Sequence, residues 1–253
     1  MEDDDDTSST SSLYSEERFL YIRNEFFSKV YALLLIQVIT SAVFILGLNI
    51  NLDVKKLLFE WFYLGPIFGM LSFISFVLLM FVARLRNLHP FNILVTFLLT
   101  SSCGGFAGIQ AAQDQFHFIW CGFGSSVIIF FILSVVSYFF SNIEDSVVIY
   151  NVLVGSIALV AIGGIAISIP ILLSIECTIV SFTFSVTACI ISACAYLYIS
   201  GVYISKFQNV DVYEPEFEKK FTEKYIFASN LLYTTIFLFY THFMGILAYV
   251  LRT

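Results

Sequence analysis

Long apolar stretches separated by short polar segments run along almost the whole chain. Seven of them can be drawn, and each has about the 20 residues that an α-helix needs to cross a bilayer. They cover residues 30–50, 61–83, 90–112, 117–140, 147–169, 178–204 and 225–250. Backbone in lipid must satisfy its hydrogen bonds internally, and these runs are not the ten-residue alternating segments of a barrel. The pattern therefore predicts an all-α, polytopic membrane protein with about seven transmembrane helices in one bundle.

Composition supports this class and limits the domain organisation. Apolar residues make up 59% of the 253 residues, and charged residues only 12%. Seven spans with short connections leave no room for a large soluble domain. Residues 1–25 begin with an acidic run, Glu2 to Asp6, and are polar without an apolar period. We expect a disordered, acidic cytosolic tail over residues 1–25 and a transmembrane domain over residues 26–253.

The lysines and arginines predict the orientation, because they set topology while acids contribute little. Nine lie on the N-terminal side of the predicted bundle and three on the other. The nine are Arg18, Arg23, Lys29, Arg84, Arg86, Lys206, Lys219, Lys220 and Lys224, and the three are Lys55, Lys56 and Arg252. This bias predicts a cytosolic N-terminus. Seven full crossings would place Arg252 on the opposite side, whereas a re-entrant last segment would return it to the cytosol.

Groups that carry catalysis are sparse within the apolar stretches. No Asp or Glu falls inside any of the seven, and the five cysteines show no Cys-x-x-Cys spacing. Residues 122–126, Gly-Phe-Gly-Ser-Ser, resemble a serine elbow only superficially, since no partner histidine can be assigned. The three histidines also stand too far apart for a zinc site. We therefore expect no enzymatic activity, no cofactor, no metal site and no nucleic-acid partner.

Polar side chains within the predicted spans are the remaining candidates for a functional path. Thr235 and His242 lie seven residues apart, so they share one face of the last predicted helix. Together with Gln37 they could line a polar path. The alternative is that His242 only hydrogen-bonds a neighbouring helix, since it lacks a proton-relay partner.

Glycines spaced four apart occur within two of the stretches. Gly65 and Gly69 form one pair, and Gly104 and Gly108 form another. Small residues at this spacing let two helices approach closely, either within the chain or across a dimer. The sequence leaves the oligomeric state open.

Motifs near both ends and in the middle of the chain resemble those of the transmembrane Bax-inhibitor family. Ser-Lys-Val-Tyr at residues 28–31 with Gln37 is similar to the family's opening, and Arg-Leu-Arg at 84–86 with Pro-Phe-Asn at 90–92 is similar to its basic loop before the third span. Residues 223–228, Glu-Lys-Tyr-Ile-Phe-Ala, and Leu232-Tyr233 match the pattern that opens its last helix. The order of these motifs carries the resemblance along nearly the whole chain.

The resemblance implies a set of functional expectations and one departure. Family members reside in intracellular membranes, usually endoplasmic reticulum or Golgi, leak calcium in a pH-sensitive way and restrain programmed cell death. Their proton-sensing pair consists of two aspartates, whose positions match Ile204 and Thr235, with a basic partner that matches Arg84. Neither Ile204 nor Thr235 can titrate, and Lys206 adds positive charge nearby. Arg84 and Lys206 could equally snorkel to the headgroups.

Three functional hypotheses follow. The first is a divergent family member that modulates cell death and intracellular calcium homeostasis through membrane-protein partners of the cell-death or calcium-release machinery, with a weakened or absent pH-gated leak. The second is a channel for Ca²⁺ that gates without the aspartate pair. The third is a receptor-like or scaffolding protein outside the family. The bilayer is a partner in all three, and the endoplasmic reticulum or Golgi is favoured over the plasma membrane.

Overall fold

The fold is described for most of the chain in a computed structural model. The described residues are 6–61, 63–82, 88, 90–112, 116–139, 155–157, 159, 160, 162, 163, 178–203 and 217–252. The helices are α1 (Asp6–Ile50), α2 (Leu52–Glu60), α3 (Leu64–Phe81), α5 (Phe91–Ala112), α6 (Phe116–Phe139), α8 (Thr178–Tyr198) and α9 (Phe217–Arg252), and a π-helical turn, η1 (Ile199–Tyr203), continues α8. No strand occurs among these residues.

Five of the helices are long and apolar enough to cross a membrane. The segments are Asn24–Ile50, Leu64–Phe81, Phe91–Ala112, Val180–Gly201 and Lys224–Val250, and α6 contains a shorter apolar segment, Gly122–Ser137. These confirm the all-α, multi-pass membrane class. The predicted span over residues 147–169 lies largely outside the described residues.

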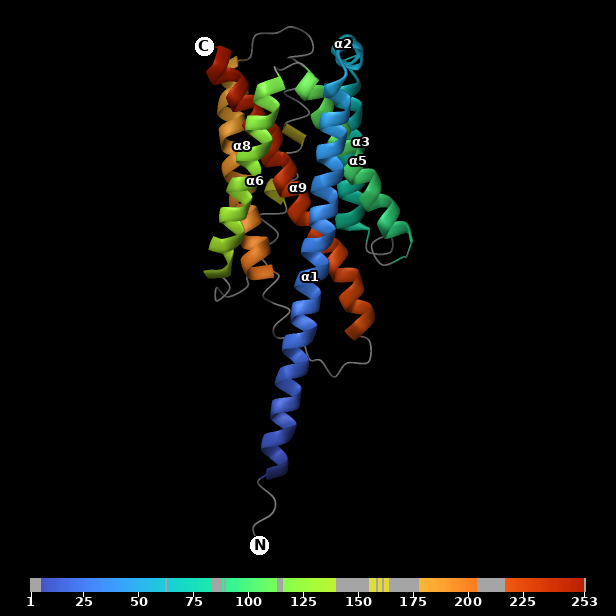
Figure 1. The fold of residues 1–253 in the computed structure, drawn as a ribbon, viewed down its shortest axis with the longest axis vertical. Coiled ribbons are helices and arrows are strands. Elements are labelled where there is room, and N and C mark those ends of the chain that lie inside the picture. Colours follow the sequence, from blue (N-terminus) through green and yellow to red (C-terminus); the bar gives the residue numbers. More distant parts are fainter. Residues whose placement is uncertain are drawn as a thin grey trace.

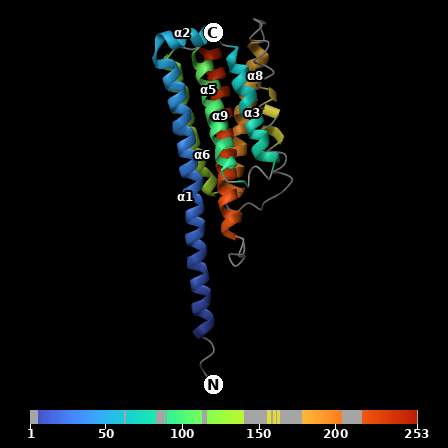
Figure 2. The ribbon, with the colours of Figure 1, turned by 90° about the vertical axis from the view of Figure 1, so that its right-hand side faces the viewer.

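The N-terminal helix is much longer than expected. α1 is helical from Asp6, so the prediction of a disordered tail over residues 1–25 is wrong for residues 6–25. Nucleation is the costly step in helix formation, and the membrane-spanning part of α1 already supplies a helical nucleus. Extending the helix outward from this nucleus therefore costs little. Figures 1 and 2 show this part of α1 projecting beyond the bundle.

The last helix, α9, lies at the centre of the molecule. It contacts α1, α3 and α5 on one side and α6, α8 and η1 on the other (Figures 1 and 2). Every residue from Ile226 to Thr235 is buried. A helix that is buried on all faces belongs to the core of a bundle.

The course of α9 bears on the alternative of a re-entrant last segment. α9 is one continuous helix from Phe217 to Arg252. It runs in the same direction as α1 and ends at the same end of the bundle as α2, opposite the start of α1 (Figures 1 and 2). The final segment is therefore one unbroken helix, long and apolar enough to cross a membrane.

Glycines of α5 allow the close approach of α1 and α3. A Cβ atom added to Gly104 would lie 3.0 Å from the Cβ of Phe44, on α1, and one added to Gly105 would lie 3.0 Å from the ring of Phe68, on α3. Gly108 likewise meets the side chain of Leu48 on α1. The spacing of glycines at 104 and 108 thus serves helix packing within the chain.

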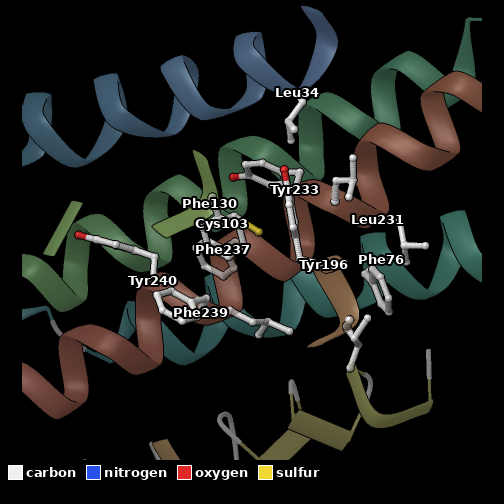
Figure 3. Packing of buried hydrophobic residues seen from close by; sticks show 14 of the residues in the cluster. Leu34, Phe76, Cys103, Phe130, Tyr196, Leu231, Tyr233, Phe237, Phe239 and Tyr240 are labelled. Atoms are coloured by element: carbon white, nitrogen blue, oxygen red, sulfur yellow. The ribbon is translucent and has the colours of Figure 1, made fainter. Parts of the chain in front are cut away.

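Aromatic residues fill the core between α9 and the helices α6 and α8. The ring of Phe130 packs edge-to-face on Tyr196, with centroids 4.7 Å apart, and on Phe239, at 5.2 Å (Figure 3). The hydroxyl groups of Ser134 and Tyr196 lie 2.6 Å apart, which satisfies the phenol inside the core. This side of α9 is held mainly by apolar packing.

Candidate functional site

The other side of α9 carries a group of buried polar side chains, which we call the polar seam. Its members are Gln37 and Ser41 from α1, Thr96 and Thr100 from α5, and Ser229, Asn230 and Tyr233 from α9. All seven are buried, and Ser229 and Asn230 have no exposed surface at all. Polar groups at this depth in a membrane protein need hydrogen-bond partners within the protein.

Gln37 lies at the centre of the polar seam. Its Nε2 donates to Oδ1 of Asn230, at 2.8 Å, and to Oγ1 of Thr100, at 3.3 Å. Its Oε1 accepts a hydrogen bond of 2.9 Å from Oγ of Ser229. One side chain on α1 therefore contacts both α5 and α9 through the nitrogen and the oxygen of its amide group.

Asn230 extends the polar seam along α5. Its Nδ2 donates to Oγ1 of Thr96 and to the carbonyl of Ile226, each at 2.8 Å. The hydroxyl of Thr96 in turn donates to the carbonyl of Asn92, one turn back in α5. Each threonine hydroxyl can thus accept from an amide of another helix while donating to its own helix.

Tyr233 closes the polar seam at its other end. Its hydroxyl lies 2.5 Å from Oγ of Ser41 and 3.5 Å from the carbonyl of Thr100. Its ring stacks on Phe237, with centroids 6.3 Å apart (Figure 3). The hydroxyl is therefore held between α1 and α5, while the ring belongs to the apolar core.

The chemistry of the polar seam is that of uncharged donors and acceptors. None of its members is Asp, Glu, His, Lys or Arg, and its amide groups are already engaged with one another. Among the residues that the structure describes, no three His, Cys, Asp or Glu side chains gather where a metal ion could bind. The geometry suits a fixed connection between three helices.

Thr235 and His242 lie away from the polar seam. Thr235 follows Tyr233 by two residues, which places it on the opposite side of α9. It is fully buried, and its hydroxyl donates to the carbonyl of Leu232 at 2.7 Å. His242 packs edge-to-face against Phe184 of α8, with ring centroids 5.3 Å apart. The structure therefore does not bring Gln37 together with the other two candidates.

The remaining candidate residues cannot be placed relative to the polar seam. Arg84, Ile204 and Lys206 lie outside the described residues, although η1 ends at Tyr203, directly before Ile204.

Sequence reasoning missed six of the seven residues of the polar seam. Asn230 was the available signal, because a carboxamide inside an apolar span usually bonds another helix. Ser and Thr give no such signal, since they often bond their own helix.

Two conservative substitutions distinguish the two sides of α9. Thr235→Val should change the free energy of unfolding by less than about 0.5 kcal/mol, because the hydroxyl bonds only its own helix. Ser229→Ala should cost about 1 kcal/mol, because it removes the donor to Gln37. Thermal unfolding of the detergent-solubilised variants provides the comparison. Equal midpoints for both would contradict the assignment of Ser229 to an interhelical network.

Comparison with known proteins assigns no family. No family model matches the chain, and no curated protein matches it. The resemblance to the Bax-inhibitor family thus rests on the order of the motifs in the sequence.

Proposed function

We propose that this chain is a Bax-inhibitor-like, multi-pass membrane protein that modulates cell death and intracellular calcium homeostasis. It acts through contacts with membrane proteins of the cell-death or calcium-release machinery, in the endoplasmic reticulum or Golgi. It has little or no pH-gated calcium leak of its own. The observation that carries this proposal is the uncharged polar seam. Residues of the motifs that resemble the family lie within this seam.

Residues from distant motifs meet around α9, which supports the family resemblance. Gln37, from the first motif, and Tyr233, from the last, both belong to the polar seam. At the end of the membrane span, Nζ of Lys29 lies 6.0 Å from the ring centroid of Tyr225. Asn92, from the middle motif, accepts the hydrogen bond of Thr96. The motifs are thus parts of one packed arrangement, and not unrelated stretches of sequence.

The chemistry of the described core supports a weak or absent calcium leak. Ca²⁺ takes six to eight oxygen ligands, among which carboxylates are prominent. The amides of the polar seam are bonded to each other, and Thr235 donates to its own helix. A proton-sensing site needs two carboxylates close enough to titrate as a pair. Thr235 supplies no carboxylate at the position that matches one of them.

Calcium efflux from liposomes tests the proposed lack of a leak. The purified protein should release no more calcium than protein-free liposomes, at pH values on either side of neutrality. The double variant Ile204→Asp and Thr235→Asp should show pH-dependent efflux if the inherited path is silenced only by the missing carboxylates. The matched control, Ile204→Asn and Thr235→Asn, places uncharged side chains of similar size at both positions and should stay silent.

Other outcomes of the same assay distinguish the competing functions. Clear efflux from the natural protein would favour a channel that gates without the aspartate pair, and replacing Thr235 and His242 with apolar residues should then alter it. Expression in cells challenged with a death stimulus completes the test. The proposal expects changed survival and changed handling of stored calcium, whereas no change in either would favour a receptor or scaffold outside the family.

A further inference from the structure

Helix α8 changes its winding before the chain leaves it. It is α-helical from Thr178 to Tyr198 and continues as the π-helical turn η1 from Ile199 to Tyr203. In a π-helical turn the backbone N–H bonds the carbonyl five residues back instead of four, so the turn holds one residue more than an α-helical turn. Such turns are rare and are often found at functional sites. The polar seam and the proposed function make no use of η1.

The chain is fixed directly before η1. Tyr196 is 1% exposed, its ring packs on Phe130 of α6, and its hydroxyl lies 2.6 Å from Oγ of Ser134 (Figure 3). Ile199, at the start of η1, belongs to the same buried cluster. A change of winding within η1 would therefore leave this part of α8 in place and move only the chain beyond it.

The Ser200 hydroxyl in η1 weakens α-helical winding without excluding it. It donates to the carbonyl of Tyr196 at 2.7 Å and lies 3.5 Å from the carbonyl of Leu197. Backbone N–H groups use the same carbonyls in an α-helix, and a serine that bonds back in this way destabilises and bends the helix. The usual preference of a chain for α-helical winding and the Ser200 hydroxyl thus oppose each other. This opposition brings the two windings closer in free energy.

Small residues leave room for both windings. Ser200 and Gly201 are buried, in a turn that contacts α6 and α9. Rewinding the turn moves these two positions along the neighbouring helices. A large side chain would be locked there by close packing, whereas a hydroxymethyl group and a hydrogen atom need little space.

We propose that η1 is a conformational switch, in which the end of α8 changes between π-helical and α-helical winding. Because the two windings differ by one residue, the change turns Tyr203 by about 100° around the helix axis. It thereby changes the direction in which the chain leaves α8 toward α9. A partner that binds one winding better than the other shifts the balance between them. The switch belongs to the fold, so it does not depend on a role in cell death.

The distance between two spin labels tests the switch in reconstituted full-length protein. Ketone-bearing phenylalanine analogues at Tyr203 and at Asn24, which is exposed on α1, accept nitroxide labels while the native cysteines stay in place. Pulsed electron paramagnetic resonance on frozen samples then gives the distribution of distances between the labels. We expect a major distance from the π-helical winding and a minor distance from the α-helical one.

Three variants of the labelled protein identify the two distances. Ser200→Ala removes the hydroxyl that opposes α-helical winding and should raise the ratio of minor to major population about threefold. Deleting Val202 removes the extra residue, so the turn becomes α-helical with Tyr203 in its present position, and only the major distance should remain. Ser192→Ala is the matched control, since it changes a buried serine in the α-helical part of α8, and it should leave the distribution unchanged.

The same distributions can overturn the proposal. A single distance that Ser200→Ala leaves unchanged would exclude a second winding. A minor distance that persists after deletion of Val202, or that rises equally in Ser192→Ala, would show that it arises elsewhere in the bundle. If the deletion prevents folding, the comparison of Ser200→Ala with Ser192→Ala decides.

Discussion

Replacing Gly104 by leucine is expected to lower the free energy of unfolding by about 3 kcal/mol, the upper part of the usual range for overpacking a core. A Cβ atom at this position would lie 3.0 Å from Cβ of Phe44 and 3.3 Å from Cα of Ser41. Both neighbours move only with the backbone of α1, so rotating a side chain cannot relieve the clash. Separating α1 from α5 would also disturb Ser41 in the polar seam.

The control for this prediction is Gly47→Leu on α1. Gly47 is exposed, and an added Cβ atom would meet nothing within 4 Å. Its substitution should leave stability unchanged within about 0.5 kcal/mol, because leucine is a better helix former than glycine and meets lipid there. Thermal unfolding midpoints in one detergent compare the two variants. Similar midpoints for both would show that α1 and α5 do not pack as closely as the structure has them.

Replacing Gln37 by leucine is expected to cost about 2 kcal/mol, because it removes every bond that this side chain makes in the polar seam. Oδ1 of Asn230 loses its donor at 2.8 Å, and Oγ of Ser229 loses its acceptor at 2.9 Å. Buried groups left without a partner carry the full cost of desolvation, about 1–3 kcal/mol. The upper end of that range is not expected, because an average interhelical bond in a membrane protein contributes about 0.6 kcal/mol.

A double-mutant cycle shows whether the loss arises from the network. Gln37→Leu combined with Ser229→Ala removes both partners of one bond, so the pair should cost less than the sum of the single variants. Gln110→Leu is the matched control, since Gln110 is half-buried on α5 outside the polar seam, and it should change stability by less than about 0.5 kcal/mol. Strict additivity of Gln37→Leu and Ser229→Ala would contradict the network.

Prediction from sequence succeeded where a local pattern was sufficient and failed where the neighbours of a residue mattered. The apolar run at residues 90–112 became α5, which begins at Phe91 and ends at Ala112. The polar composition of residues 6–25 suggested disorder, yet α1 is helical there because it continues an existing helix. Thr235 and His242 do share a side of α9, as their spacing predicts, but Gln37 bonds a different side.

The sequence alone determined that this protein is an all-α membrane protein, because hydrocarbon leaves a long apolar segment no other way to satisfy its backbone. It did not determine which polar side chains meet. Gln37 and Asn230 are separated by 193 positions and bond at 2.8 Å only because α9 passes between the two halves of the bundle. Helical periodicity specifies the face on which a residue lies, but the partner of that face depends on how the helices assemble. Only the tertiary structure decided that α9 is central and that its seam with α1 and α5 is uncharged and closed.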